Sequence, residues 1–195
     1  MQLSSAGSSV EDRIFVTDGD LEKYCGLAVE AGATHAKQIH PASVVTAPWV
    51  RLKCQYGCWN YGKGLCCPPH TPTSDETRAI LDSYQRAILF HIQSPSTRDR
   101  RKRFRSYFET LVELEGDMFK DGYYKAFVFL AGPCRICKKC GALEDNLCAH
   151  GGQARPSMEG CGIDVYQTAR IKRPATMDSL YKRFANGTKR IMNTA

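Results

Sequence analysis

The sequence predicts an α/β fold, in which helices flank a small mixed sheet that is largely parallel, with two cysteine-rich loops at one edge. Helical periodicity alternates with short β-rich segments along the chain, and this alternation favours strands that run parallel in one layer. Each cysteine-rich segment follows a predicted strand, and sites in open α/β sheets gather at the carboxyl ends of strands. The 195 residues suffice for one domain with its own core.

We expect three parts in the chain. Residues 1–18 form a disordered lead-in without the basic and apolar regions of a secretory signal. Residues 19–172 form a single metal-binding domain, and residues 173–195 form a C-terminal tail. The longest apolar run, AFVFLAG from Ala126, is too short to span a bilayer. We therefore expect a cytoplasmic protein without a membrane partner.

The first half of the domain contains a helix, short strands and a cysteine-rich loop. A helix begins at the cap candidate Asp20 and ends near Gly32. The segments HAKQIH, SVVTA and WVRLKC, broken by Pro41 and Pro48, predict one or two strands. Glycines and prolines leave residues 54–70 as a loop.

The second half alternates helices with strands. TPTSDETRAILDSYQ predicts a helix capped by Thr73 or Ser74, and RAILFHI predicts a strand. The longest predicted helix follows, and YYKAFVFLAG predicts a strand that stops at Gly132. A last helix is predicted near GIDVYQTARI. The apolar stripe of the longest helix has near-helical spacing and includes one acid: Phe104, Tyr107, Phe108, Leu111, Leu114, Glu115 and Met118.

Ten cysteines dominate the chemistry. In a reducing compartment, clustered cysteines bind metal or carry out redox chemistry more often than they form stable disulfides. A chain of this length also has less need of a disulfide framework. We therefore favour metal over disulfides, with Cys25 as a small buried residue on the apolar side of the first helix.

The second cysteine group reads Cys134-x2-Cys137-x2-Cys140-x7-Cys148. Bacterial ferredoxins begin their cluster-binding run with the same spacing, in which each turn aims a sulfur at a different iron. Zinc sites also use C-x2-C, usually as two pairs separated by a long excursion. The third closely spaced cysteine favours iron–sulfur, with zinc as the alternative.

The first group reads Cys54-x3-Cys58-x8-Cys67, with Cys66 beside Cys67. Three well-spaced cysteines leave a cluster one ligand short. Cys161 is one candidate for that ligand, and Cys66 and His70 compete with it. A further alternative leaves one iron open to a substrate.

Eight thiols, the number that two [4Fe–4S] clusters require, follow from this count. The candidate cofactor-binding and metal-binding residues are Cys54, Cys58, Cys67, Cys134, Cys137, Cys140, Cys148 and Cys161.

Four blocks of sequence together resemble a known family. They are CQYGCWNYGKGLCCPPH, GYYKAFVFLAGPCRICKKC, CAH and RPSMEGCGIDVYQTA. They are similar to an uncharacterised prokaryotic group, domain of unknown function 2284, labelled as predicted metal-binding proteins. The resemblance spans about residues 20–170 and implies metal binding, with iron–sulfur as the expected form. It supports seven of the eight candidate cysteines, and Cys161, which lies in the last block, is the weakest carry-over.

The leading hypothesis is an iron–sulfur protein with two [4Fe–4S] clusters that transfers electrons to, or assists, a partner enzyme. One alternative is an enzyme that activates a small substrate at an open iron. Another is a zinc-binding module that contacts nucleic acid through the basic run RDRRKRFR, part of a net charge of +7. We find no dinucleotide fingerprint, P-loop, HExxH or GxSxG motif. A redox protein is the expected partner, in preference to nucleic acid.

Overall fold

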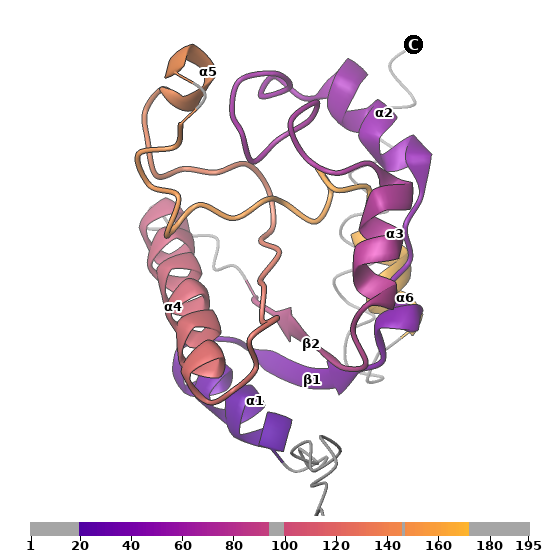
Figure 1. Ribbon diagram of the computed structural model, residues 1–195, viewed down its shortest axis with the longest axis vertical. Coiled ribbons are helices and arrows are strands. Elements are labelled where there is room, and N and C mark those ends of the chain that lie inside the picture. The colour runs from indigo at the N-terminus through magenta and orange to yellow at the C-terminus, as the bar shows by residue number, and fades with distance from the viewer. Residues whose placement is uncertain (1–19, 94–99, 146, 172–195) are drawn as a thin grey trace, which may run out of the picture.

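The computed structural model describes residues 20–93, 100–145 and 147–171 (Figure 1). The predicted lead-in (1–18) and tail (173–195) lie outside the described residues. The elements, in chain order, are α1 (Asp20–Glu30), β1 (His35–Ile39), the 3-10 helix η1 (Pro41–Ser43), α2 (Pro48–Gly57), α3 (Ser74–Asp82), β2 (Ala87–His91), α4 (Arg100–Lys120), α5 (Ala142–Asp145) and α6 (Val165–Ile171).

The sheet of the described chain has two strands and is antiparallel, so the prediction of a largely parallel sheet is wrong. β1 pairs with β2 in a register that joins His35 to His91 and Ile39 to Ala87. The predicted strand YYKAFVFLAG does not join this sheet. It makes a single parallel bridge between Leu130 and Ser157. The α/β character is confirmed. The third predicted strand stays outside the sheet, and the connection through η1, α2 and α3 returns the chain so that β2 runs opposite to β1.

The segment WVRLKC is helical, and its prediction as a strand is also wrong. It forms most of α2, which begins at Pro48. Proline suits the first turn of a helix because its φ is already helical and its missing N–H would have no partner there. As a consequence, Cys54 lies on α2 and Cys58 caps its end. The predicted loop over residues 54–70 therefore begins only after Gly57.

The predicted helix over residues 71–85 is confirmed as α3. Thr73 caps it with a complete capping box, in which the Thr73 side chain accepts from the Glu76 amide and the Glu76 carboxylate accepts from the Thr73 amide. These reciprocal bonds satisfy backbone donors that the first turn would otherwise leave unpaired. The exit from the first cysteine loop is thereby defined.

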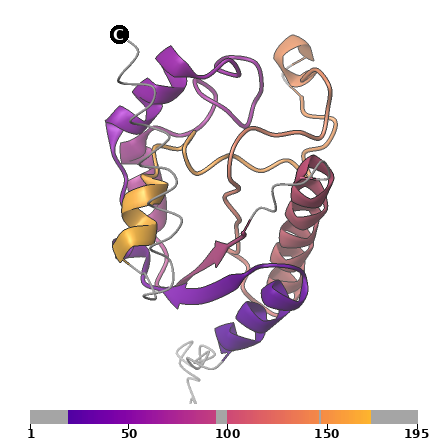
Figure 2. The ribbon, with the colours of Figure 1, turned by 180° about the vertical axis from the view of Figure 1, so that it is seen from behind.

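The main core lies between α1, α4 and the sheet. Tyr24 and Ala28 of α1 are buried with Leu111 and Leu114 of α4. The predicted stripe of α4 is confirmed at Leu111 and Leu114. Leu27 of α1 is exposed. Two views show α1, the C-terminal part of α4 and the sheet at one end of the molecule and the cysteine-bearing segments at the other (Figures 1 and 2).

A second, smaller core joins β1 to the C-terminal segment. Ile39, Val44, Leu81 and Ile163 are buried together. This core fixes residues 157–164 against α3, and so it positions the segment that carries Cys161. In the part of the chain that the structure describes, no helix has the length and apolar character needed to cross a membrane.

Leu111→Ala tests the main core. Leu111 of α4 packs in the core with α1 and is only 6% exposed. Truncation of a buried leucine costs about 2–5 kcal/mol of unfolding free energy. Urea denaturation of the purified protein measures the change. Val29→Ala is the matched control because Val29 is 46% exposed on α1, and we expect it to change stability by less than about 0.5 kcal/mol. Equal effects of the two substitutions would contradict this core assignment.

Candidate metal centre

Segments far apart in the sequence meet at the end of the molecule opposite α1 (Figure 1). Backbone hydrogen bonds join them: the Leu130 amide donates to the Pro156 carbonyl at 2.9 Å, and the Met158 amide donates to the Leu130 carbonyl at 2.8 Å. The Ser157 amide donates to the Cys66 carbonyl at 3.3 Å. Irregular backbone thus takes the place of a sheet edge in bringing the cysteine segments together.

Helix α2 aligns the first two cysteines of the first group. Cys54 and Cys58 are four residues apart, so they lie on the same side of the helix. Cys58 is the C-cap, and its amide donates to the Cys54 carbonyl at 3.2 Å. Cys67 follows in the next loop, where the Asn60 side-chain amide donates to its sulfur at 3.1 Å.

Arg51 connects this helix to two other segments. Its Nη1 donates to the carbonyl oxygens of Thr71, Pro72 and Gly160 at 3.0, 2.7 and 2.7 Å. The bond to Gly160 brings the turn that contains Cys161 under α2. Arg51 therefore holds in place the helix with Cys54, the loop after Cys67 and the turn with Cys161.

Cys161 is brought to the first group, as the count of eight required. Its side chain is fully buried, and burial raises the pKa of its thiol to about 12. It interacts electrostatically with Cys67, and Cys54 does so with Cys58 and Cys67. The Cys54 thiol also points at the carbonyl oxygen of Glu159, 4.0 Å away. Four thiols from three segments thus occupy one neighbourhood.

The cysteines of the second group interact with one another. Cys137 interacts electrostatically with Cys134, Cys140 and Cys148. The Cys134 thiol has a lowered pKa because the Cys66 side chain hydrogen-bonds to it, with the Ile136 amide and His150 adding to the effect. His150 is therefore a neighbour of this group.

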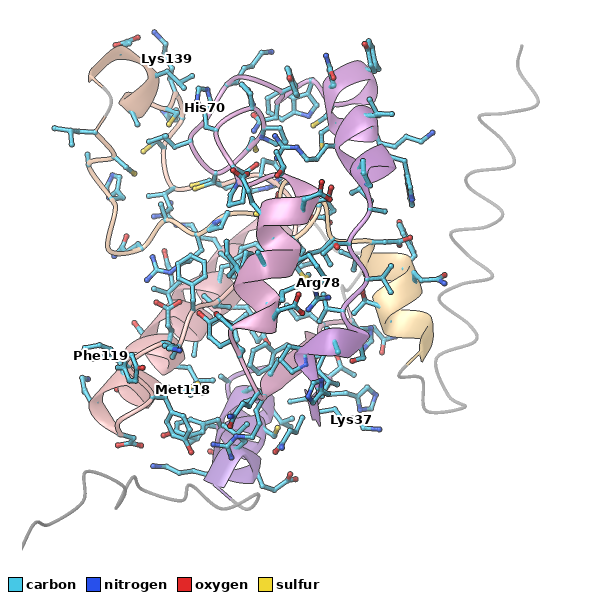
Figure 3. All side chains as sticks on the ribbon, turned by 45° about the vertical axis from the view of Figure 1, so that its right-hand side comes forward. Lys37, His70, Arg78, Met118, Phe119 and Lys139 are labelled. Carbon is cyan, nitrogen blue, oxygen red and sulfur yellow. The ribbon has the colours of Figure 1, made fainter. Side chains whose placement is uncertain are left out.

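Cys66 lies with the second group and not with the first. Its hydrogen bond to Cys134 and its burial raise the pKa of its thiol, and it also interacts with Cys148. Cys67, the next residue, faces Cys58 and also interacts with Cys134. The two groups therefore adjoin at the Cys66–Cys67 pair. His70, the other competitor for the fourth ligand, has an exposed side chain (Figure 3).

All ten cysteines are free thiols in this structure. Within residues 20–93, 100–145 and 147–171, no three or more His, Cys, Asp or Glu side chains are arranged to hold a metal ion. The donor chemistry nevertheless fits a metal, since thiolates are the preferred ligands of zinc and of iron–sulfur clusters. Each group provides four thiols, the number that either kind of site requires.

A nearly buried ion pair joins α4 to the segment that follows the second cysteine group. The Arg155 guanidinium contacts the Glu115 carboxylate at 2.6 and 2.9 Å, and both side chains are nearly buried. The same carboxylate accepts the Val128 amide at 2.7 Å. Sequence reasoning missed this pair, although an acid in the apolar stripe of α4 was the signal that a cation must face it.

The fold and the site define a class of protein: a mixed α/β domain with two adjoining groups of thiols at one end. A family described as "Predicted metal-binding protein (DUF2284)" matches residues 37–179. The chain belongs to this family, as the resemblance implied. No curated protein matches the chain, and no solved structure matches it either.

Arg155→Met tests the support that the ion pair provides. The substitution leaves the Glu115 carboxylate buried without its cation, and we expect a loss of about 3–5 kcal/mol of unfolding free energy. Urea denaturation of metal-loaded protein measures it. Glu109→Gln is the control because the Arg105–Glu109 pair is exposed and contributes at most about 1 kcal/mol. A similar loss in both variants would show that Arg155 has no special structural role.

Proposed function

We propose that the protein carries two [4Fe–4S] clusters and acts in electron transfer, or as a redox accessory to a partner enzyme. The observation that supports the proposal is that segments bearing Cys54, Cys58, Cys67 and Cys161, and segments bearing Cys134, Cys137, Cys140 and Cys148, lie next to each other at one end of the molecule. One of those groups has the spacing of a ferredoxin run. Adjoining clusters suit electron transfer because an electron entering at one site has a short path to the other.

Cys134, Cys137, Cys140 and Cys148 would hold the first of these clusters. A bound cluster supplies one-electron redox chemistry, and the surrounding protein sets its potential. Here the hydrogen bond from the Cys66 side chain lowers the pKa of Cys134, and the Ile136 amide and His150 add to the effect. These groups favour the thiolate that a cluster needs as a ligand. Lys138 is exposed beside the ligands, whereas Lys139 is ion-paired with Glu144. Positive charge near a cluster makes it easier to reduce.

Cys54, Cys58, Cys67 and Cys161 would hold the other cluster. Cys161 is favoured over Cys66 and His70 because it lies near Cys67 and under α2, whereas Cys66 faces Cys134. The Asn60 amide that donates to the Cys67 sulfur would raise the potential of this site. Because Cys161 is fully buried, water has little access to the iron that this thiol would bind.

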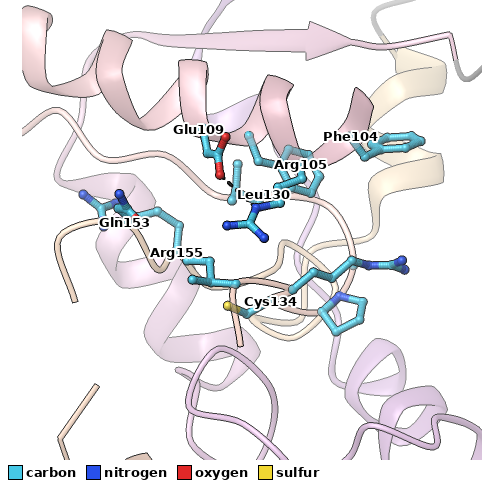
Figure 4. A pocket seen from close by; sticks show the side chains of 12 residues that line it. Phe104, Arg105, Glu109, Leu130, Cys134, Gln153 and Arg155 are labelled. Carbon is cyan, nitrogen blue, oxygen red and sulfur yellow. Dashed lines mark hydrogen bonds and ion pairs between the residues drawn. The ribbon is translucent and has the colours of Figure 1, made fainter. Parts of the chain in front are cut away.

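A small cavity beside Cys134 bears on the enzymatic alternative (Figure 4). Its volume is about 40 Å³, and Phe104, Phe108 and Leu130 contribute to its apolar lining. This is room for a few water molecules, whereas sites for organic substrates usually enclose about 300–1,000 Å³. The cavity leaves no room for a bulky substrate beside Cys134, and an enzyme that activates a small substrate at an open iron of the Cys54 group stays the second candidate function. The zinc-binding nucleic-acid module remains the other alternative.

Metal analysis of anaerobically purified protein tests the proposal directly. We expect about eight irons and eight sulfides per chain, with a broad absorbance near about 400 nm that bleaches on reduction. One or two zinc ions per chain in a colourless protein would overturn it.

Cysteine substitutions test which thiols are ligands. Cys137→Ser should lower the iron content from about eight to about four per chain, because the other site keeps its ligands. Cys161→Ala should also lower the iron content, whereas Cys66→Ala should leave it near eight. Cys25→Ala is the matched control, since Cys25 is buried in the α1 core away from both groups. Loss of iron in Cys66→Ala with full iron in Cys161→Ala would reverse the assignment of the fourth ligand.

A further inference from the structure

Helix α2 turns an aromatic and aliphatic face to solvent. Trp49, Leu52 and Tyr56 are 48%, 53% and 81% exposed, and their spacing of three and four residues places them on one side of the helix. Trp59, just beyond the helix, is 75% exposed. Large apolar side chains gathered at one place on a surface mark sites of protein association more often than isolated ones do.

The opposite side of the same helix carries the first thiol group. Val50 is buried, Arg51 points inward to the Gly160 carbonyl, and Cys54 points to the Glu159 carbonyl. One helix, about 10 Å across, therefore separates a partner bound at the exposed face from the Cys54 sulfur.

The charge around this face is positive. Residues 31–74 contain no Asp or Glu, and Lys53 is exposed beside the aromatic side chains. The Lys63 ammonium lies over the Trp59 ring, 5.6 Å from its centroid. Residues 122–143, which include most of the second thiol group, also lack acids. Cations without interspersed carboxylates attract an acidic partner and exclude a basic one.

We propose that this surface, the α2 face (Trp49, Leu52, Lys53, Tyr56, Trp59 and Lys63), docks a small acidic electron-transfer protein. The inference rests on the proposed function, since it names the partner with which the cluster held by Cys54, Cys58, Cys67 and Cys161 would exchange an electron. Tryptophan and tyrosine are the side chains that most often dominate binding energy at interfaces. Lysines around them speed the encounter by electrostatic attraction.

The chain's own C-terminal residues are the competing occupant, and charge argues against them. Residues 172–195 contain six Lys or Arg and one Asp, so a basic segment would have to bind a basic surface. Like charges facing each other across an interface oppose association. An acidic partner meets no such opposition.

Calorimetric titration of the metal-loaded protein tests the proposal, with two acidic probes: a plant-type [2Fe–2S] ferredoxin and a flavodoxin. We expect at least one probe to bind with a Kd on the order of micromolar at low ionic strength and more weakly as salt is added. Trp49→Ala and Tyr56→Ala should each weaken binding about tenfold or more. The double substitution Lys53→Glu, Lys63→Glu should weaken it and flatten its salt dependence.

Matched controls lie at the far end of the molecule (Figure 3). Phe119→Ala removes an aromatic side chain that is 61% exposed, and Lys37→Glu reverses an exposed charge on β1. Neither should change binding. Both tryptophans of the chain lie in the α2 face, so protection of tryptophan emission from acrylamide quenching, measured on metal-loaded protein with a tryptophan-free ferredoxin as the probe, provides a second readout of the same contact.

Each outcome decides the inference. Binding that the α2-face substitutions weaken and the controls spare supports it. Binding of neither probe, or binding that all variants share, overturns it, as does preferential binding of a DNA oligonucleotide that depends on the same lysines. Iron analysis is independent of these variants: iron without docking removes only the α2-face proposal, and docking without iron removes the two-cluster proposal.

Discussion

The guanidinium of Arg51 is the interaction on which the arrangement of the first thiol group depends. Its Nη1 reaches the carbonyl oxygens of Thr71, Pro72 and Gly160 from α2. These acceptors belong to irregular segments, whose carbonyls need partners once they are buried. The two N–H groups of this nitrogen are shared among the three carbonyls, and together these contacts link the segments that carry Cys54, Cys67 and Cys161.

The end of the molecule that carries the thiols has little regular structure. Between α2 and α3, and again between α4 and α6, short turns and isolated bridges take the place of a sheet. The ion pair of Glu115 with Arg155 and the second core at Ile163 provide the support that strands would provide elsewhere. In regions of this kind metal binding stabilises the folded state, because the ligands come together only when the chain is folded. The core between α1, α4 and the sheet is the scaffold. A bound metal or cluster would complete the end of the molecule that carries the thiols.

The position of Cys66 gives the two thiol groups a shared boundary. Cys66 hydrogen-bonds to the Cys134 side chain, and Cys67 interacts with Cys58 and also accepts a hydrogen bond from the Cys134 backbone. The Cys66–Cys67 pair therefore separates the two groups by a single peptide unit. Gly64 brings the same loop close to Cys140, whose sulfur lies 3.9 Å from the place where a side chain at Gly64 would begin. An alanine at this position would therefore make an ordinary van der Waals contact with Cys140.

Local patterns determined much of this protein. The buried stripe of α4, the cap of α3 and the strands at residues 35–39 and 87–91 follow from apolar spacing and from side chains that bond to nearby backbone. The two groups of cysteines follow from spacing alone. Other features depended on residues distant in the chain. The antiparallel pairing of β1 with β2, the helical state of α2, the partner of Glu115 and the separation of Cys66 from Cys67 were decided by tertiary structure. The physical reason is that periodicity reports which side of an element is buried, whereas pairing direction and ligand grouping depend on what the rest of the chain places against that side.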